Sequence, residues 1–259
     1  MFKNSHLSTV GIVLRRREYG DFDLIVTFLT QDHGKITLIA KSAKKSAKRF
    51  PGILEPFSQL QISFRKSRGN GMAILEEASL NQSVAGIRSD FLKIAYASYW
   101  VECIILWMEE GRVRPDIYLL LSDVLQELNN AIVSADMLSI LFQMRFIGQE
   151  GLQPIIESCT HCQTHIDKLS QFDFCVDLGK GGVVCNQCST GSHHGLRLAK
   201  GTLKQLLWVV DGDLAKAKRV RFSRRTMAEA TAFLETFVPY HIGRIPKSLR
   251  ILQQTRKGA

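Results

Sequence analysis

The chain has 259 residues, of which 45% are hydrophobic, and a formal net charge of +10. This length allows one large domain or two to three small ones. The charge is uneven: residues 1–80 hold 13 Lys and Arg against 7 Asp and Glu, residues 81–152 hold 5 against 9, residues 153–195 hold 2 against 4, and residues 196–259 hold 14 against 4. Basic ends around an acidic middle favour a binder of nucleic acid or of another anionic surface over an enzyme for small neutral substrates.

Neither a secretory signal nor a membrane span is expected. The apolar stretch near the N-terminus is short and ends in three arginines, and the apolar run at 94–108 is shorter than a bilayer-spanning helix. We therefore expect a cytosolic protein without a membrane partner. Its six cysteines are then not expected to form disulfides.

The first 80 residues predict five short strands. Segments 9–15, 24–30 and 35–41 are rich in β-branched residues and are separated by Gly and Asp, which favour turns. Segment 59–66 alternates polar and apolar residues, and a glycine-containing turn leads from it to segment 72–77. Five antiparallel strands at this spacing favour a small barrel, either the OB-fold that binds single-stranded nucleic acid or an SH3-like barrel.

Helical periodicity begins near residue 89. Residues 91–108 are apolar nearly all round, which predicts a buried helix whose aromatic side chains belong to the core. Further helices are expected after Pro115, after Ser134, at 201–210, and at 223–238 with Ser223 as N-cap and Pro239 as terminator.

The expected architecture is α+β with four segments. An OB-type barrel domain is expected at 1–80, and an all-helical domain is expected to combine 81–152 with 196–259. The cysteine-rich segment at 153–195 is expected to form a module inserted between the two helical parts.

Four cysteines form two C-x2-C pairs, Cys159 with Cys162 and Cys185 with Cys188. Each pair can place two thiolates on one ion, and two pairs complete a tetrahedral zinc shell that leaves no position for a substrate water. We therefore predict a structural Zn²⁺ that holds about 30 residues with too few large apolar groups to fold alone. Iron–sulfur ligation and a metal-free module are alternatives, whereas a thioredoxin-like redox pair would need a strand-to-helix setting that is missing here.

No enzyme motif is found. The sequence lacks a GxxxxGK[ST] phosphate loop, a GxSxG nucleophile elbow and an HExxH metal-binding helix. Cys103 and Cys175 are expected to be small buried residues outside the metal shell. We expect a protein that is not an enzyme.

Four blocks of sequence resemble a known family. They are the barrel segments GIVLRRREYGDFDLIVTFLTQDHGKITLIAK and RFPGILEPFSQLQISFRK, the stretch MRFIGQEGLQPIIESCTHC that enters the first cysteine pair, and GRIPKSLRILQ near the C-terminus. In this order they resemble the bacterial DNA repair and recombination proteins of the RecO family, and the resemblance covers nearly all of the chain.

The resemblance implies an N-terminal OB-fold, a helical domain and an inserted zinc-finger-like module whose ligands are the four paired cysteines. It also implies binding of single- and double-stranded DNA, annealing of complementary strands, and loading of the RecA recombinase, together with RecR, onto strands coated by single-stranded DNA-binding protein. Lys247 and Arg250 correspond to the helix that meets the acidic, aromatic-ended tail of that coating protein. The expected location is the bacterial cytoplasm, in association with the nucleoid.

Annealing requires cations, because repulsion between two polyanions opposes their pairing. The basic stretch IAKSAKKSAKRFPGILEPF at 39–57 connects the third and fourth predicted strands, and we expect it to be a DNA-contact loop with a short helix. Tyr19 and Phe50 are candidates for base stacking. The cations expected to contact DNA are Arg15, Arg17, Lys35, Lys41, Lys44, Lys45, Lys48, Arg49, Arg65, Lys66, Arg68, Arg219, Arg221, Arg224 and Arg225.

Two other functions are kept as alternatives. One is a zinc-ribbon and barrel adaptor that binds RNA or a transcription complex, and the other is a redox or metal-dependent enzyme that uses the thiolates. Competition between DNA and RNA oligonucleotides separates the first from a DNA annealing protein, and metal analysis with thiol titration tests the second.

Overall fold

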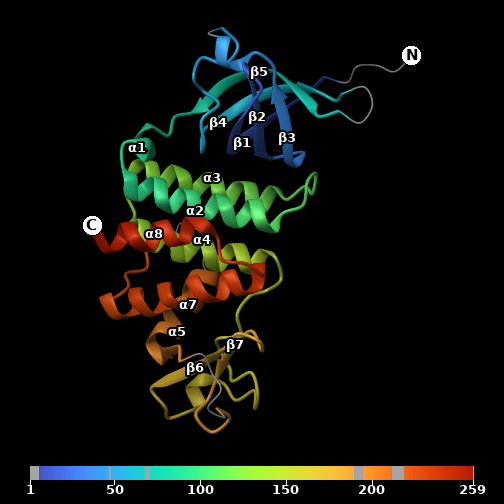
Figure 1. The fold of residues 1–259 in the computed structure, drawn as a ribbon. Coiled ribbons are helices and arrows are strands. Elements are labelled where there is room, and N and C mark those ends of the chain that lie inside the picture. The colour runs from blue at the N-terminus through green and yellow to red at the C-terminus, as the bar shows by residue number, and fades with distance from the viewer. Residues whose placement is uncertain (1–5, 47, 68–70, 190–194, 212–218, 259) are drawn as a thin grey trace. The chain divides into compact units, whose positions relative to one another are not determined.

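The computed structural model describes residues 6–46, 48–67, 71–189, 195–211 and 219–258. They belong to two compact units, which are divided in sequence between Asn130 and Ala131. Figure 1 shows the elements of each unit along the chain.

The first unit contains a closed barrel of five strands, which confirms the five predicted from the sequence. The barrel order is β1-β2-β3-β5-β4, and β4 pairs back with β1. All neighbours are antiparallel except β3 and β5, which pair in parallel at Leu38–Ala73 and Ile39–Ile74. This is the topology of an OB-fold. The strands are β1 (His6–Tyr19), β2 (Asp23–Thr30), β3 (Gly34–Ala40), β4 (Gln59–Arg65) and β5 (Ala73–Gln82).

The barrel interior is an apolar core supplied by alternate residues of the strands. Leu60, Ile62 and Phe64 of β4 are buried there, as the alternation of that segment predicts, and they join Val26 and Phe28 of β2. Burial of apolar side chains is the main favourable contribution to folding. Because the inner faces of the strands supply this burial, the side chains on their outer faces are available for other functions.

Three helices complete the first unit: α1 (Ala85–Arg88), α2 (Phe91–Trp107) and α3 (Pro115–Asn130). The carboxylate of Asp90 caps α2 by accepting hydrogen bonds from two amides of its first turn. Trp100 of α2 is fully buried, which confirms that this aromatic residue belongs to the core, whereas Phe91 in the first turn is exposed, so the prediction is wrong for that residue. In Figure 1, α2 and α3 lie at one end of the barrel.

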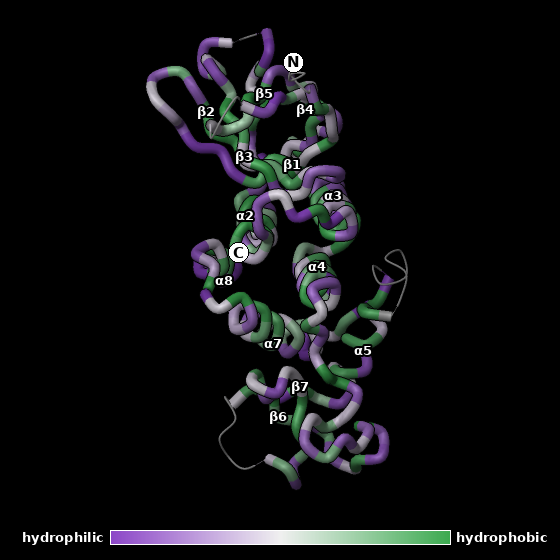
Figure 2. The backbone as a smooth tube through the Cα atoms, turned by 90° about the vertical axis from the view of Figure 1, so that its right-hand side faces the viewer, coloured by the Kyte–Doolittle hydropathy of each residue, from purple (hydrophilic) through white to green (hydrophobic). Residues whose placement is uncertain are grey.

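The second unit contains α4 (Ala135–Gln149), α5 (Lys200–Asp211), α7 (Arg224–Ile242) and α8 (Lys247–Gly258). Ser134 and Ser223 cap α4 and α7, as predicted, by accepting hydrogen bonds from backbone amides. Green and purple segments alternate along α7 and α8 in Figure 2, as expected where one side of a helix packs and the other faces water. By contrast, most residues of α4 are buried. Among the described residues, none of the helices combines the length and hydrophobicity that a bilayer crossing requires.

Pro239 lies inside α7, so the prediction that it ends this helix is wrong. The helix continues to Ile242 and ends at Gly243, whose φ of 79° is a left-handed conformation that glycine adopts readily. Pro239 removes only one backbone donor, close to the helix end, and its ring is buried.

A small sheet of order β7-β6-β8 lies between α4 and α5 in sequence. Its strands are β6 (Asp173–Asp177), β7 (Gly182–Val184) and β8 (Arg197–Ala199). Phe174, Val176 and Val183 are fully buried. The cysteine module therefore has more apolar core than the sequence analysis assumed.

Candidate functional site

The basic connection, defined as residues 41–49, lies between β3 and β4 on the barrel. It contains a single turn of 3₁₀ helix at Ala43–Lys45, at the place where the lysine spacing predicts a short helix. The start of β2 holds it: the Ser42 amide donates to the Asp23 carboxylate at 2.7 Å, and the Lys44 amide donates to the Phe22 carbonyl at 3.0 Å. All five of its basic residues are exposed: Lys41, Lys44, Lys45, Lys48 and Arg49.

Two of these cations contact the barrel domain outside the connection, and a third is held within the connection, which the local sequence does not reveal. The Lys44 ammonium group lies 2.8 Å from the Glu18 carboxylate, and its hydrogen bond lowers the pKa of Glu18 below the ordinary value. The Lys45 ammonium group lies 3.4 Å from the centroid of the exposed Phe22 ring, and Arg49 donates to the Lys41 carbonyl at 2.8 Å. These contacts orient the side chains without burying their charge.

A hollow of about 680 Å³ lies beside the basic connection, over the outer face of β4 and β5. Lys48 and Arg49 line it from the connection, and the remaining lining is mostly hydroxyl and amide groups of the strands. The Gln61 amide donates to the Ser8 hydroxyl at 2.9 Å, so part of this polar surface is already ordered. The lining residues are Ser8, Lys48, Arg49, Gln61, Ile62, Ser63, Glu77, Ala78 and Ser79.

The arginines of β1 follow a bulge between Val13 and Arg15 and are all exposed. Arg15 and Arg17 lie opposite Thr27 and Ile25 of β2, whereas Arg16 lies opposite Val26 and pairs with the Glu55 carboxylate. Side chains of a strand alternate between its faces, so Arg15 and Arg17 share a face that Arg16 does not.

Lys35 is used inside the first unit. Its ammonium group donates to the carbonyls of Ile105, at 3.0 Å, and of Met108, near the end of α2, and burial lowers its pKa. We therefore leave Lys35 out of the proposed DNA surface. Phe50 is also unsuited to base stacking, because its side chain is buried in the barrel core, whereas Tyr19 is exposed.

Other predicted cations of the barrel domain differ in their surroundings. Arg65 is partly buried and lies 2.9 Å from the Glu76 carboxylate, which also contacts His6 at 2.7 Å. Lys66 is exposed. Arg68 lies outside the described residues.

The second basic cluster is at the start of α7 and includes Arg219, Arg221, Arg224 and Arg225, all exposed. Arg225 lies 2.6 Å from Glu229 one turn further along the helix. Arg224 lines a hollow of about 660 Å³ whose other lining residues come mainly from α7 and α8. Lys247 and Arg250 are exposed on α8.

The four paired cysteines converge. The sulfur atoms of Cys159, Cys162, Cys185 and Cys188 all lie within 4.8 Å of one another, and those of Cys162 and Cys185 are 3.9 Å apart. Four thiolates about 2.3 Å from one ion in a tetrahedron would be about 3.8 Å apart, so the residues fit a single metal ion. An iron–sulfur cluster would hold its thiolates further apart, since its irons lie between them. Cys175 lies outside this group, as predicted.

Cys162 and Cys188 differ in acidity because they differ in hydrogen bonding. Thr164, whose hydroxyl oxygen lies 3.3 Å from the Cys162 sulfur, lowers the pKa of Cys162 to about 6, whereas hydrogen bonding with Cys185 raises the pKa of Cys188 to about 12. A metal binds thiolates, so binding must release the protons of the weaker acids. Metal retention is therefore expected to fall in acid.

Backbone contacts bring the two cysteine pairs together. Ile155 and Gly182 form a short parallel bridge, in which the Val183 amide donates to the Ile155 carbonyl at 2.9 Å and the Ile155 amide donates to the Gly181 carbonyl at 2.9 Å. Gly182 makes this approach possible, because a Cβ at that position would lie 2.2 Å from the Ile155 carbonyl oxygen. The Cys185 amide then donates to the Cys159 sulfur at 3.4 Å.

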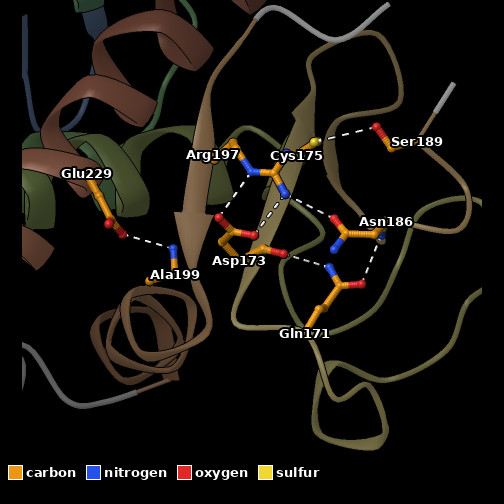
Figure 3. A network of polar contacts seen from close by, with 8 residues as sticks. All are labelled: Gln171, Asp173, Cys175, Asn186, Ser189, Arg197, Ala199 and Glu229. Carbon is orange, nitrogen blue, oxygen red and sulfur yellow. Dashed lines mark hydrogen bonds and ion pairs between the residues drawn. The ribbon is translucent and has the colours of Figure 1, made fainter. Parts of the chain in front are cut away.

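A polar network shown in Figure 3 holds the second cysteine pair against the sheet. The Arg197 guanidinium group donates to both carboxylate oxygens of Asp173, at 2.8 and 3.1 Å, and to the Asn186 side-chain carbonyl at 3.0 Å. The Asn186 amide in turn donates to Gln171 at 2.9 Å. Asn186 follows Cys185 directly, so the network fixes the loop that presents two of the four thiols.

Glu229 of α7 connects the same sheet to the second basic cluster. Its carboxylate accepts hydrogen bonds from the Ala199 amide at 2.9 Å, the Thr202 hydroxyl at 2.6 Å and Arg225 at 2.6 Å. Burial alone would raise its pKa, but the hydrogen bonds from Thr202 and Arg225 hold the pKa below its ordinary value. No local motif in the sequence marks Glu229, so its role could not be predicted.

Comparison with known proteins gives two family matches that together cover most of the chain. Residues 5–84 match the model for the N-terminal part of recombination protein O, and residues 88–250 match the model for its C-terminal part.

Curated relatives agree over nearly the full length. The DNA repair protein RecO of Desulfatibacillum aliphaticivorans is 43% identical over 253 residues, covering 97% of this chain and 98% of that protein. That of Desulfosudis oleivorans is 42% identical, covering 96% and 98%, and that of Bacillus subtilis is 30% identical, covering 94% and 92%. The blocks of sequence, the barrel topology, the cysteine cluster and these matches agree, and the chain belongs to the RecO family.

Proposed function

We propose that this protein is a DNA repair and recombination mediator that binds single- and double-stranded DNA and anneals complementary strands. The observation that carries the proposal is the exposed basic connection at residues 41–49, beside a polar hollow on an OB-type barrel, in a member of the RecO family. OB-folds combine cationic grooves with exposed polar and aromatic groups when they bind single strands.

The proposed mechanism is electrostatic and has no chemical step. Lysines and arginines neutralise the phosphates of both strands, which removes the repulsion that opposes pairing and leaves the bases free to find partners. The hydroxyl and amide groups beside Lys48 and Arg49 suit a sequence-tolerant contact. Exposed Tyr19 and Phe22 offer the aromatic surfaces of this barrel domain for stacking.

A charge-reversal experiment tests the proposed surface. Lys41, Lys45 and Lys48 are changed to Glu, and the binding of labelled single strands is measured over a range of salt concentrations. The slope of log affinity against log salt is expected to become shallower by about two, since each phosphate contact on a single strand contributes roughly 0.7. Annealing should slow in parallel.

A matched control reverses three exposed cations outside the proposed surface, Lys168, Lys180 and Arg244. Both variants change the net charge by the same amount, so an equal loss in the control would show that overall charge, and not the basic connection, governs binding. Affinity of the unaltered protein that does not depend on salt would contradict the proposal. Preference for RNA over DNA would favour an RNA adaptor.

We further propose that the four-cysteine group holds a structural zinc ion. The spacing of the sulfurs suits one tetrahedral ion, and a shell of four protein thiolates leaves no open position for catalysis. When bound, zinc would fix the two cysteine pairs in one arrangement. Elemental analysis of the purified protein tests this: one zinc per chain is expected, and iron in its place would contradict it.

Partners are proposed from the family. We infer that the protein acts with RecR to load RecA onto strands coated by single-stranded DNA-binding protein, in the bacterial cytoplasm at the nucleoid. The hollow near α7 and α8 has apolar lining at Met227 and Ala228 and basic lining at Arg224 and Lys257, which suits an acidic tail with an aromatic end. Its two carboxylates, Asp136 and Glu235, both pair with Arg256. Lys247 and Arg250 on α8 are the proposed contacts for that tail.

A further inference from the structure

The first unit contains a second recess that the proposed DNA surface does not use. It is a cavity of about 160 Å³ at the junction of the barrel with α3, and we call it the amide pocket. Its apolar lining consists of Ile12, Phe57, Val84 and Leu125, all buried.

The polar lining of the amide pocket is neutral. Among the described residues no charged side chain lines it, while carboxamides and hydroxyls do. Groups of this kind can both donate and accept hydrogen bonds without the desolvation cost of an ion. The polar lining residues are Gln59, Gln82, Ser83, Ser122, Gln126, Asn129 and Asn130.

Two of these amides are held in fixed orientations. Gln59 is buried, and its side-chain nitrogen donates to the Tyr118 hydroxyl at 2.6 Å and to the Ser122 hydroxyl at 3.2 Å. Both of its protons are therefore committed, whereas its carbonyl oxygen has no hydrogen-bond partner in the part of the chain that the structure describes. The Asn129 carbonyl oxygen accepts from the Gly86 amide at 2.9 Å. Preset groups of this kind lower the entropic cost of binding a ligand.

Phe57 is held in a strained conformation in this wall. Its φ of 71° lies in the left-handed region, which a bulky residue rarely adopts. Two backbone hydrogen bonds enforce it, from the Phe57 amide to the Val13 carbonyl at 2.8 Å and from the Val13 amide to the Ser58 carbonyl at 2.9 Å. Strain of this kind gathers at binding sites, where the surrounding structure holds it in place.

A cation lies close to the pocket in the same unit. Arg88 follows Val84 by one helical turn, and its guanidinium group donates to the Ser58 hydroxyl at 2.5 Å. The chain neighbours of Ser58, Phe57 and Gln59, both line the pocket. Arginine has five donors, and Arg88 is exposed, so further donors are available for a phosphate.

We propose that the amide pocket binds the base of a pyrimidine nucleotide, with Arg88 contacting its phosphate. The size supports a single ring, because a cavity of about 150 Å³ accommodates benzene. The neutral amides support a nucleobase, since proteins that take up an unstacked base read its hydrogen-bonding edge and cover its faces with apolar side chains. The nucleotide would be either an unpaired residue of a DNA strand or a free nucleoside monophosphate.

Titration with thymidine 5′-monophosphate tests the site, with saturation-transfer NMR to detect contact of the thymine ring. Gln126→Trp fills the pocket from an exposed position on α3 and is expected to weaken binding at least about tenfold. Leu119→Trp adds the same side chain at an exposed α3 position outside the pocket and should leave binding unchanged. Arg88→Gln should weaken the monophosphate about tenfold and thymidine hardly at all.

Three results would overturn the proposal: no saturable binding of the monophosphate, equal or tighter binding of adenosine 5′-monophosphate, or full binding by Gln126→Trp. Circular dichroism of each variant establishes that it is folded.

An oligonucleotide that carries 5-iododeoxyuridine identifies the source of the base. Photo-crosslinks to the peptide containing Phe57 would place a DNA residue in the pocket, whereas binding of the monophosphate without such crosslinks would assign the site to free nucleotides. The variant with Lys41, Lys45 and Lys48 changed to Glu should retain its affinity for the monophosphate. Failure of the proposed DNA surface and failure of the amide pocket are therefore distinguishable.

Discussion

The barrel and the cysteine module are stabilised in different ways. The barrel buries a continuous apolar core, with Phe28, Leu60 and Leu75 fully inaccessible, and long strands close around it. The module has three short strands, converging thiols, and a network of partly exposed polar side chains around Arg197. A region that folds by burial can carry repelling charges on its surface. A region that relies on the proposed metal ion and a few oriented polar groups has less tolerance for change.

Removal of one thiol should have the largest effect. Cys185→Ser is expected to abolish metal binding and loosen residues 153–199, since structural zinc contributes about 10–16 kcal/mol in zinc-finger peptides. Metal analysis measures the loss of the ion, and hydrogen exchange measures the loosening of the module. The barrel amides should keep their protection against exchange. Cys175→Ala is the matched control, because this buried cysteine lies outside the cluster. Retention of stoichiometric zinc by Cys185→Ser would refute the assignment.

Removal of a core ring from the barrel should have the next largest effect. Phe28→Ala is expected to destabilise the barrel by about 3–5 kcal/mol, because it leaves a cavity in a fully buried position. Urea denaturation followed by hydrogen exchange of β2 and β3 measures the loss. Zinc content should not change, and a parallel loss of zinc would show that the two regions do not fold independently.

Loss of the arginine fork should affect the module without unfolding it. Arg197→Lys keeps the charge but cannot donate to both Asp173 oxygens and to Asn186 together. We expect zinc to be lost to a chelator about tenfold more readily, as for other residues that orient metal ligands. Arg221→Lys makes the same substitution at an exposed position just before α7 and serves as the control. Equal rates of zinc loss in both variants would argue against an orienting role.

The smallest effect concerns acid. The folded state lowers the pKa of Glu229, so its contribution to stability is present above the unfolded pKa of about 4.3 and is lost as the pH falls through the lower folded value. Glu229→Gln should cost about 1 kcal/mol at neutral pH and remove this part of the acid dependence. Thermal melts of both proteins between neutral pH and pH 3 measure the difference. If the melting temperatures of the two proteins fall in parallel as the pH is lowered, Glu229 does not contribute to the acid dependence of stability.

Hydrophobic patterns of period two or 3.6, together with local residue spacing, predicted much of the fold and the convergence of the four paired cysteines. Alternation in β4, the caps Ser134 and Ser223, and the cysteine pairs are local features, and each is found in the structure. The position of Pro239 inside α7 could not be predicted in the same way, because burial against the rest of the unit decides it.

Partners distant in sequence could not be predicted either. Lys35 looks like any other lysine until α2 brings two carbonyls to it, and Lys44 appears unopposed until β1 brings Glu18 alongside. Gln59 continues the polar side of an alternating strand, yet it is buried against Tyr118 because α3 covers that end of the barrel. Each of these contacts joins residues that are far apart in sequence. The pattern of residues within one strand or helix carries no information about them.

The parallel contact between β3 and β5 is much shorter than the antiparallel ladders on either side, with Leu38–Ala73 and Ile39–Ile74 as its only Cα partners among the residues that the structure describes. The basic connection begins at Lys41, two residues after Ile39, where this contact ends. The basic connection thus starts at the one seam of the barrel where few backbone bonds resist separation. A strand of DNA bound there would act on the weakest closure of the barrel, and binding could adjust its width while the long ladders stay intact.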